Sequence, residues 1–255
     1  MVNAGDKYVT RTYRSRHDAK DLHYFNIIIK ETDLAIGVDK DSYTDSLLSL
    51  GEREVINLRG DLETYIALQP EFRTSFFPLK LLSGAPAIAG IMAEAAAMAG
   101  VGPMAAVAGA IAQAVGEKLA GQVREIIVEN GGDIYINSSH PRIISVFAGE
   151  SEFSNKVGIR VAENEGPIGI CTSSGTVGPS ISLGKADAVV IKADSTALAD
   201  ALASRAANQI QTEKDLMKAI NSVQNIKGIR GILAIKGDQM AAWGDIELVP
   251  VEVKR

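Results

Sequence analysis

Asp200 and Ser204 are the residues whose types and spacing come nearest to a metal site in this sequence. They lie four positions apart in residues 193–208, which have the alanine content and the capping residues of a helix. Side chains four apart share one face of a helix, so a carboxylate and a hydroxyl would lie together. These hard oxygen donors suit Mg²⁺, which takes few protein ligands and completes its shell with phosphate oxygens. The alternative is a solvated helix face.

A glycine pair between two apolar runs is a second candidate. Asn130, Gly131, Gly132 and Asp133 connect these runs, and Asn-Gly is a strong signal for a hairpin turn. Two glycines also allow the backbone to approach a ligand closely, with Asp133 projecting beside it. The sequence therefore predicts a turn, which is either a plain connection or part of a binding site.

A third candidate is the run Thr172, Ser173, Ser174 and Gly175, which follows another apolar strand. Small hydroxyl residues and glycine can present backbone N–H groups to a phosphate, and we expect the amides of Ser173 to Gly175 to do so. An ordinary polar loop has the same composition. The run matches neither a Walker motif nor a Gly-x-Ser-x-Gly elbow, and no histidine can be assigned to it. A serine hydrolase built on Ser173 or Ser174 is therefore kept only as a control hypothesis.

Composition limits the remaining possibilities. The chain has 255 residues, of which 46% are hydrophobic and 22% charged, so it can form a core without metal or disulfide. Its net charge of -5 argues against nucleic acids and anionic membranes as partners. The three histidines have no zinc-ligand spacing, and the single cysteine, Cys171, excludes an intramolecular disulfide. Without a visible secretory segment, these features predict a cytoplasmic protein.

Hydrophobic periodicity predicts the elements that position these candidates. The predicted strands are 8–13, 22–38, 124–136 with its turn, 142–149, 156–162, 168–174, 186–194, 228–237 and 245–254, and the predicted helices are 41–68, 193–208 and 213–223. We expect Asp41 or Ser42 to cap the first helix, and Asp194 or Ser195 to cap the helix at 193–208. Runs of strands interrupted by helices favour an α+β fold.

The alanine-rich region 83–121 is predicted to form two helices. Residues 95–116 carry no formal charge, so a membrane span is an alternative. Gly100, Gly102 and Pro103 would break such a span, and alanine is only weakly driven into lipid. A buried, bent helix pair is therefore the favoured interpretation.

Three of these features occur in the order found in the ApbE-like superfamily, whose best-known members are Mg²⁺-dependent flavin transferases. The segments 102–136, 170–175 and 187–206 resemble its glycine-rich helix with a V-N-x-G-G-D turn, its Thr-Ser-Gly loop and its last strand and helix. The chain looks most like an uncharacterised branch of that superfamily. The resemblance implies a T-fold-like α+β architecture of antiparallel sheets packed with alanine-rich helices. It also implies one domain over residues 1–255, with two pseudo-repeated lobes, about 1–125 and 126–255, as a variant.

The resemblance also implies roles for the candidate residues. Asp200 and Ser204 match the two side chains that hold Mg²⁺ in flavin transferases, with serine in place of threonine. The turn from Asn130 to Asp133 matches the turn near the flavin nucleotide. The run from Thr172 to Gly175 matches a loop that lines the same pocket. Mg²⁺ and FAD, or a related nucleotide, are therefore the expected cofactors.

Two departures from the family pattern bear on activity. Flavin transferases carry a His-Ile-Ile-Asp-Pro tract before the last strand, whereas residues 176–186 contain no histidine. The lysine of their Ala-Lys-Gly turn is also absent, because residues 106–109 read Ala-Val-Ala-Gly. The leading hypothesis is a protein that binds a flavin or a nucleotide diphosphate with Mg²⁺, with transfer of FMN or a nucleotidyl group left open. The alternative is a non-catalytic or accessory protein of sulfur, homocysteine or cofactor metabolism, with a protein partner.

Overall fold

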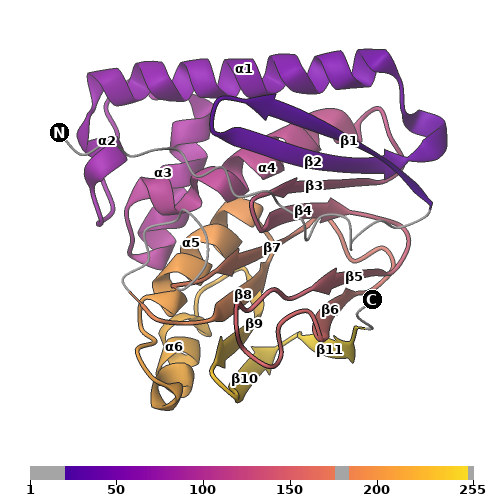
Figure 1. Cartoon of the computed structure of the whole chain (residues 1–255). Helices are drawn as coiled ribbons and strands as arrows, with labels where there is room; N and C mark the ends of the chain where they lie inside the picture. The colour runs from indigo at the N-terminus through magenta and orange to yellow at the C-terminus, as the bar shows by residue number, and fades with distance from the viewer. Residues whose placement is uncertain (1–20, 176–183, 252–255) are drawn as a thin grey trace.

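An eight-stranded sheet forms the middle layer of the protein, with helices on one face and a three-stranded sheet on the other (Figure 1). The computed structural model describes residues 21–175 and 184–251, so the strand predicted at 8–13 lies outside the described residues. The paired strands within these ranges are antiparallel. Antiparallel sheets packed with separate helices make an α+β fold, which confirms the class that the sequence predicts.

The large sheet joins strands from both halves of the chain. Its spatial order is β1-β2-β3-β4-β7-β8-β9-β10, and that of the small sheet is β11-β6-β5. The strands are β1 (Leu22–Ile29), β2 (Thr32–Asp39), β3 (Ile126–Asn130), β4 (Asp133–Asn137), β5 (Arg142–Ser145), β6 (Val157–Val161), β7 (Ile168–Ser173), β8 (Ala188–Ala193), β9 (Ile229–Lys236), β10 (Gln239–Gly244) and β11 (Glu247–Pro250). Sequence periodicity missed β10, because its sequence QMAAWG does not alternate between apolar and polar residues.

Six α-helices and three 3₁₀ turns make up the described helical elements. They are η2 (Lys40–Ser42), α1 (Asp45–Leu68), α2 (Glu71–Thr74), α3 (Ala87–Ala99), η3 (Pro103–Ala106), α4 (Val107–Ala120), α5 (Thr196–Ala207), η4 (Glu213–Asp215) and α6 (Leu216–Val223). The long helices are those that the apolar periodicity predicts. The short helix α2 was not predicted, since four residues carry no measurable period.

The caps of two helices test the sequence predictions. The prediction that Asp41 or Ser42 caps α1 was wrong, because both lie in η2, where the Ser42 hydroxyl donates to Asp39 at 2.7 Å. Thr44 caps α1 instead, and its hydroxyl accepts from the amide of Leu47 at 3.2 Å. For α5, one of the two predicted caps is confirmed, namely Ser195.

The alanine-rich region forms the bent helix pair that the sequence predicts. The axes of Ala87–Ala99 and Pro103–Ala120 differ by 102°. Gly100 ends α3 with a φ of 67°, and a Cβ at Gly102 would lie 1.8 Å from the carbonyl oxygen of Ser75. By length and apolar composition no single described helix could cross a membrane, whereas this bent pair passes that test as a pair. Much of the pair is buried in the protein core.

Alternation along the strands decides which side chains face the helices. In β4, Ile134 packs toward the small sheet, whereas Tyr135 packs in the core under α1 and α4. In β7, Ile170 packs toward the small sheet, whereas Cys171 packs in the core under α5. Side chains two positions apart point to the same face of a strand, so Asp133 also faces the helices.

Candidate functional site

Three buried side chains form a row across the helix-facing side of the large sheet. Asn130 at the end of β3 pairs with Asp133 at the start of β4, and Asp133 pairs with Cys171 of β7. Paired residues of neighbouring antiparallel strands lie side by side on one face. We call Asn130, Asp133 and Cys171 the sheet row. The helices α4 and α5 cover the face on which it lies (Figure 1).

The hairpin turn predicted between Asn130 and Asp133 is confirmed. Gly131 and Gly132 have φ values of 69° and 110°, and the favoured turns of two-residue hairpins need positive φ. The amide of Thr172 donates to the carbonyl oxygen of Gly132 at 3.1 Å. The structure therefore brings the two glycine-containing segments together, as the shared site requires.

The start of α4 lies over the sheet row and connects it to α5. The Nδ2 of Asn130 donates to the carbonyl oxygen of Ala108 at 3.1 Å, and the amide of Gly109 donates to the Oδ2 of Asp200 at 2.9 Å. A Cβ at Gly109 would lie 2.4 Å from the carbonyl oxygen of Thr196 and 2.8 Å from the Cβ of Asp200. Only glycine permits this approach of the two helices. The carboxylate of Asp200 is therefore turned toward the protein and is not part of a solvated helix face.

The carboxylates of Asp200 and Asp133 influence each other. Burial raises the pKa of Asp200 well above its usual range, and the negative charge of Asp133 raises it further, while backbone amides of α4 act in the opposite direction. Burial also raises the pKa of the Cys171 thiol, and the charges of both carboxylates add to the effect. The Cys171 thiol donates to the carbonyl oxygen of Thr196 at 3.3 Å. A positive charge placed here would be stabilised, because it would offset the charges of the buried Asp133 and the partly buried Asp200.

Ser204 lies one helical turn after Asp200 on α5, as the sequence predicts. Its side chain is partly buried. Within the described residues, no hydrogen bond holds its hydroxyl group. The pair therefore has the helical spacing of the predicted metal ligands, and the role of both residues as ligands stays a prediction.

The run from Thr172 to Gly175 is only partly a loop. Thr172 and Ser173 belong to β7 and pair with β8. The amide of Gly175 donates to the carbonyl oxygen of Ala186 at 2.9 Å, and the hydroxyl of Ser174 donates to the same oxygen at 3.4 Å. In this structure the fold uses the Gly175 amide where the chain returns to β8, and the binding of phosphate by the amides of Ser173 to Gly175 stays a prediction. Residues 176–183, where the histidine tract of flavin transferases would be sought, lie outside the described residues.

Sequence analysis missed three residues that build this site. Gly109 lies in an alanine-rich helix, and no sequence motif marks the close approach of this residue to α5. Cys171 and Thr196 contact each other across the sheet–helix boundary, 25 positions apart in the chain. One signal was present: Cys171 lies two positions before Ser173 in a predicted strand, so it shares a face with a candidate residue.

A second cluster of charged side chains joins the start of β1, the start of β3 and the start of β5. The guanidinium of Arg142 donates to both carboxylate oxygens of Asp21, at 3.0 and 2.8 Å, and pairs with the buried Glu125. Burial acts to raise the pKa of Glu125, but hydrogen bonds from two serines, Arg142 and His140 lower it to about 2. Ligand atoms of Asp21, Glu125 and His140 lie within 4.8 Å of one another. Because Arg142 pairs with both carboxylates and offsets one of their two negative charges, this cluster is an ion-pair network and a poor cation site.

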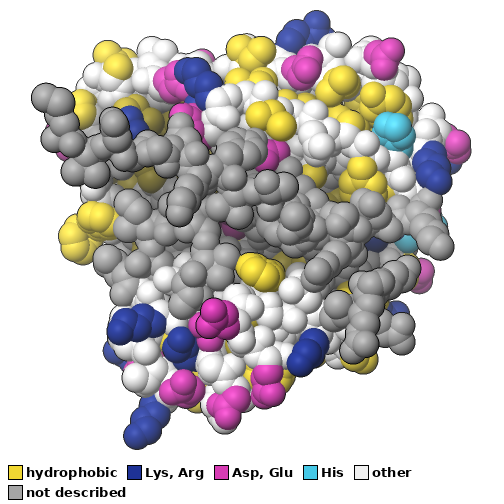
Figure 2. All heavy atoms as spheres, viewed as in Figure 1, with side chains coloured by type: hydrophobic (Ala, Val, Ile, Leu, Met, Phe, Trp, Pro, Cys, Tyr) yellow, Lys and Arg dark blue, Asp and Glu magenta, His cyan; other side chains and the backbone are white. Residues whose placement is uncertain are grey.

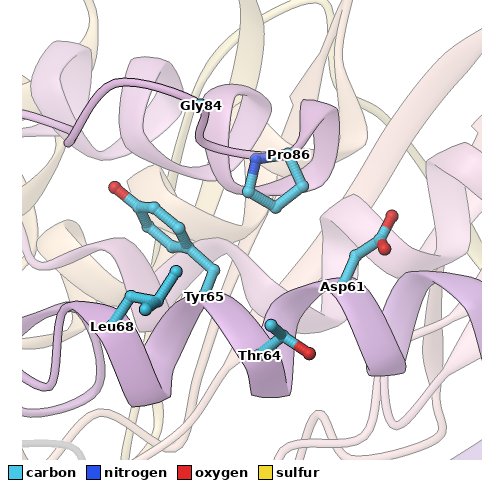
Figure 3. A pocket seen from close by; sticks show the side chains of 6 residues that line it. All are labelled: Asp61, Thr64, Tyr65, Leu68, Gly84 and Pro86. Atoms are coloured by element: carbon cyan, nitrogen blue, oxygen red, sulfur yellow. The ribbon is translucent and has the colours of Figure 1, made fainter.

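A small surface pocket lies away from the sheet row, between α1 and the start of α3 (Figure 3). Its lining residues are Asp61, Thr64, Tyr65, Leu68, Gly84 and Pro86. The hydroxyl of Tyr65 donates to Gln69 at 2.5 Å and accepts from the amide of Leu82 at 2.9 Å, so the polar end of the ring is already engaged. The pocket includes no residue of the sheet row or of α5.

The described part of the face drawn in Figure 2 shows no large patch of one charge sign. Figure 2 shows acidic and basic side chains interspersed around α6 and β10 on the described part of the visible face. The chain as a whole has a net charge of only -5. The like charges that need an explanation are the carboxylates of Asp133 and Asp200, which lie between the large sheet and the helices.

Comparison with known proteins identifies the family. The model of the family described as AbpE bacteria matches residues 14–227 of this chain. The chain belongs to that family. This ApbE-like protein is 40% identical over 232 residues to a UPF0280 protein of Methanocaldococcus jannaschii, covering 89% of this chain and 93% of the relative. It is 37% identical over 225 residues to a UPF0280 protein of Methanosarcina barkeri, covering 87% of this chain and 86% of the relative.

Solved structures share the fold of this ApbE-like protein. A histidine-to-glycine mutant of the flavin transferase ApbE from Vibrio cholerae has a TM-score of 0.58 at 14% identity, covering 88% of this chain and 97% of that chain. The apbe protein from Thermotoga maritima has a TM-score of 0.54 at 13% identity, covering 86% and 96%. The ApbE-like architecture predicted from the order of the motifs is confirmed.

Proposed function

We propose that this protein binds a flavin nucleotide, either FAD or a related nucleotide diphosphate, together with Mg²⁺ at the start of α4. The observation that carries the proposal is the acidic pair Asp200 and Asp133, which lies where burial and mutual repulsion raise the pKa of Asp200. A divalent cation would offset this unfavourable charge. The shared fold with proteins named as flavin transferases supports a flavin nucleotide as the ligand.

The donor atoms at this place fit Mg²⁺. Asp200 offers a carboxylate and Ser204 a hydroxyl one turn away, and both are hard oxygen ligands. The amide of Gly109 fixes one carboxylate oxygen of Asp200, and an ionised carboxylate retains further lone pairs for a cation. When bound, Mg²⁺ would neutralise phosphate charge and stabilise the charge that develops on a leaving phosphate.

Several segments of the chain would contact the nucleotide or position the groups that do. Asn130 holds the start of α4 through the carbonyl oxygen of Ala108, so amides at this helix end stay directed toward the site. The turn at Gly131 and Gly132 has no side chains and allows a ligand to approach the backbone. Thr172 adjoins this turn at the end of β7 and would line the nucleotide pocket.

A second candidate function is a protein that holds the same ligand, or a partner chain, without transferring FMN. The absence of histidine from residues 176–186 favours this candidate, because the resembling flavin transferases have a His-Ile-Ile-Asp-Pro tract there. The Gly175 amide also has a hydrogen-bond partner within the protein, so one of the expected contacts to phosphate is already occupied. Such a protein would serve sulfur, homocysteine or cofactor metabolism as an accessory factor.

Isothermal titration with FAD, in the presence and absence of Mg²⁺, tests the proposal. We expect micromolar binding that depends on Mg²⁺ in the wild type, and at least tenfold weaker binding in Asp200→Ala. Asp238→Ala is the matched control, because the exposed Asp238 carboxylate accepts from Gln239 at 3.4 Å and has no other hydrogen bond or ion pair within residues 21–175 and 184–251. This variant should bind as the wild type does. Absence of heat from the wild type with Mg²⁺ would contradict the proposal.

The two candidate functions differ in what happens to the bound nucleotide. Chromatography of FAD after incubation with the protein and Mg²⁺ would show AMP release if the protein cleaves or transfers the flavin. Binding with intact FAD, together with a stable partner in a pull-down, would favour the accessory function.

A further inference from the structure

One side chain of α4, Gln113, caps the beginning of α5. Its Oε1 accepts from the Ser195 hydroxyl at 2.9 Å, from the Thr196 amide at 2.9 Å and from the Ala197 amide at 3.3 Å. Its Nε2 donates to Glu117 at 2.9 Å, which fixes the amide with its oxygen toward α5. The first amides of a helix have no partner within that helix, so this oxygen completes the cap that Ser195 begins.

The helix α5 makes the matching contact with α4 one turn away. Gln113 comes four residues after Gly109, and Asp200 comes four residues after Thr196. The amide of Gly109 donates to Asp200 at 2.9 Å, so each helix caps amides near the beginning of the other. Two contacts one helical turn apart fix both the rotation of α5 and its position along α4.

Packing alone would hold these two helices weakly against sliding. The contact includes Gly109, which has no side chain, and α5 is rich in alanine. Helices keep their relative position by inserting ridges of side chains into grooves, and small residues make shallow ridges. Polar contacts therefore contribute most to fixing the position of α5 along α4. Gln113 is also the only polar side chain between residues 95 and 116.

We infer that Gln113 is a positioning residue for Asp200: it holds the first turn of α5 and thereby sets where the Asp200 carboxylate lies against the start of α4. This inference rests on the proposed function where Mg²⁺ is concerned, while the contact between the helices exists without a metal. Gln113 itself would touch neither the cation nor the nucleotide. Its loss would displace a ligand, and ligand geometry within about 0.5 Å decides whether a metal site works.

Substitutions of Gln113 distinguish the effect of its accepting oxygen from the effect of its size. Methionine has a similar length but no oxygen, and it is a good helix former. Glutamate keeps an accepting oxygen at the same reach, and a carboxylate is favourable at the beginning of a helix. Because the Gln113 amide also donates to Glu117, the variant written Gln113→Glu carries Glu117→Gln as well, so that two carboxylates do not face each other. Asparagine keeps the amide but is one methylene shorter. The matched control is Gln224→Met, because the Gln224 side chain donates to Asn221 of α6 at 3.1 Å and does not cap α5.

Hydrogen exchange in the metal-free protein gives the first measurement. We expect the amide of Gly109 to exchange at least tenfold faster in Gln113→Met than in the wild type. It should remain within threefold of the wild type in Gln113→Glu and in Gln224→Met. The amide of Val190, in the buried strand β8, corrects for any change in global stability. Gln113→Asn should behave like Gln113→Met, and it replaces that variant if methionine prevents folding.

Titration with Mg²⁺ alone, below the melting temperature of every variant, gives the second measurement. We expect at least fivefold weaker binding in Gln113→Met and rescue to within threefold by Gln113→Glu. A lower melting temperature with unchanged Gly109 exchange and unchanged Mg²⁺ affinity would overturn the inference, since Gln113 would then only stabilise the fold. If the wild type itself does not bind Mg²⁺, the proposed function is wrong, while exchange at Gly109 still decides the role of Gln113.

Discussion

Replacing Gly109 by alanine should destabilise the protein, although alanine is the better helix former. The added Cβ would lie 2.4 Å from the carbonyl oxygen of Thr196, where ordinary contact begins at 3.4 Å. The helices α4 and α5 would have to separate by about 1 Å to remove this clash. Such a separation would also lengthen the 2.9 Å hydrogen bond from the Gly109 amide to Asp200.

The size of the effect follows from two opposing contributions. Overpacking of a close contact costs about 1–3 kcal/mol. The helix propensity of alanine returns about 1 kcal/mol relative to glycine. The free energy of unfolding should therefore fall by up to about 2 kcal/mol, which corresponds to a decrease in melting temperature of up to roughly 8 °C for a chain of this size. The affinity for Mg²⁺ should fall with it, because Asp200 is displaced.

Gly60→Ala in α1 is the matched control for this prediction. A Cβ at Gly60 meets nothing within 4 Å, so the same chemical change should raise the free energy of unfolding by up to about 1 kcal/mol. Urea unfolding of both variants and of the wild type would measure the difference. A Gly109→Ala protein as stable as Gly60→Ala would show that α4 and α5 do not approach as closely as described.

Three further predictions follow from the perturbed pKa values. Glu125 has a folded-state pKa of about 2 instead of 4.5; its contribution of about 3 kcal/mol is therefore present above pH 4.5 and lost as pH falls toward 2. Urea unfolding between pH 6 and 3 should show this loss in the wild type but not in Glu125→Gln, and equal slopes would contradict it. Burial and Asp133 raise the pKa of Asp200; Asp200→Asn should therefore raise the melting temperature of the metal-free protein at pH 7, and a decrease would count against this electrostatic argument. Burial raises the pKa of Cys171; mass spectrometry should find it unmodified by iodoacetamide until the protein unfolds, and rapid modification of the native protein would show that it is accessible.

Local patterns in the sequence correctly predicted the hairpin and the helix that carry candidate residues. The glycine pair after Asn130 predicted the hairpin, because few other residues adopt positive φ at low cost. Helical spacing placed Ser204 one turn after Asp200. Each of these predictions depends on residues close together in the chain.

Contacts between distant segments could not be predicted in the same way. The Gly109–Asp200 hydrogen bond joins residues 91 positions apart, and no local pattern encodes it. The hydrogen bond from the Gly175 amide to Ala186 was not predicted for the same reason, since Ala186 belongs to the returning chain. The error at Asp41 and Ser42 has another cause, because Ser42 hydrogen-bonds Asp39 and leaves the capping of α1 to Thr44.

The position of a bound divalent cation is the decisive measurement for the proposed site. Mn²⁺ can replace Mg²⁺ and is located by its anomalous scattering in crystals grown with FAD. We predict a peak about 2.0–2.2 Å from a carboxylate oxygen of Asp200 and from the Ser204 hydroxyl, with FAD phosphate completing the shell. A peak at Asp21, Glu125 and His140 instead, or FAD bound with no metal near Asp200, would contradict the assignment of this site.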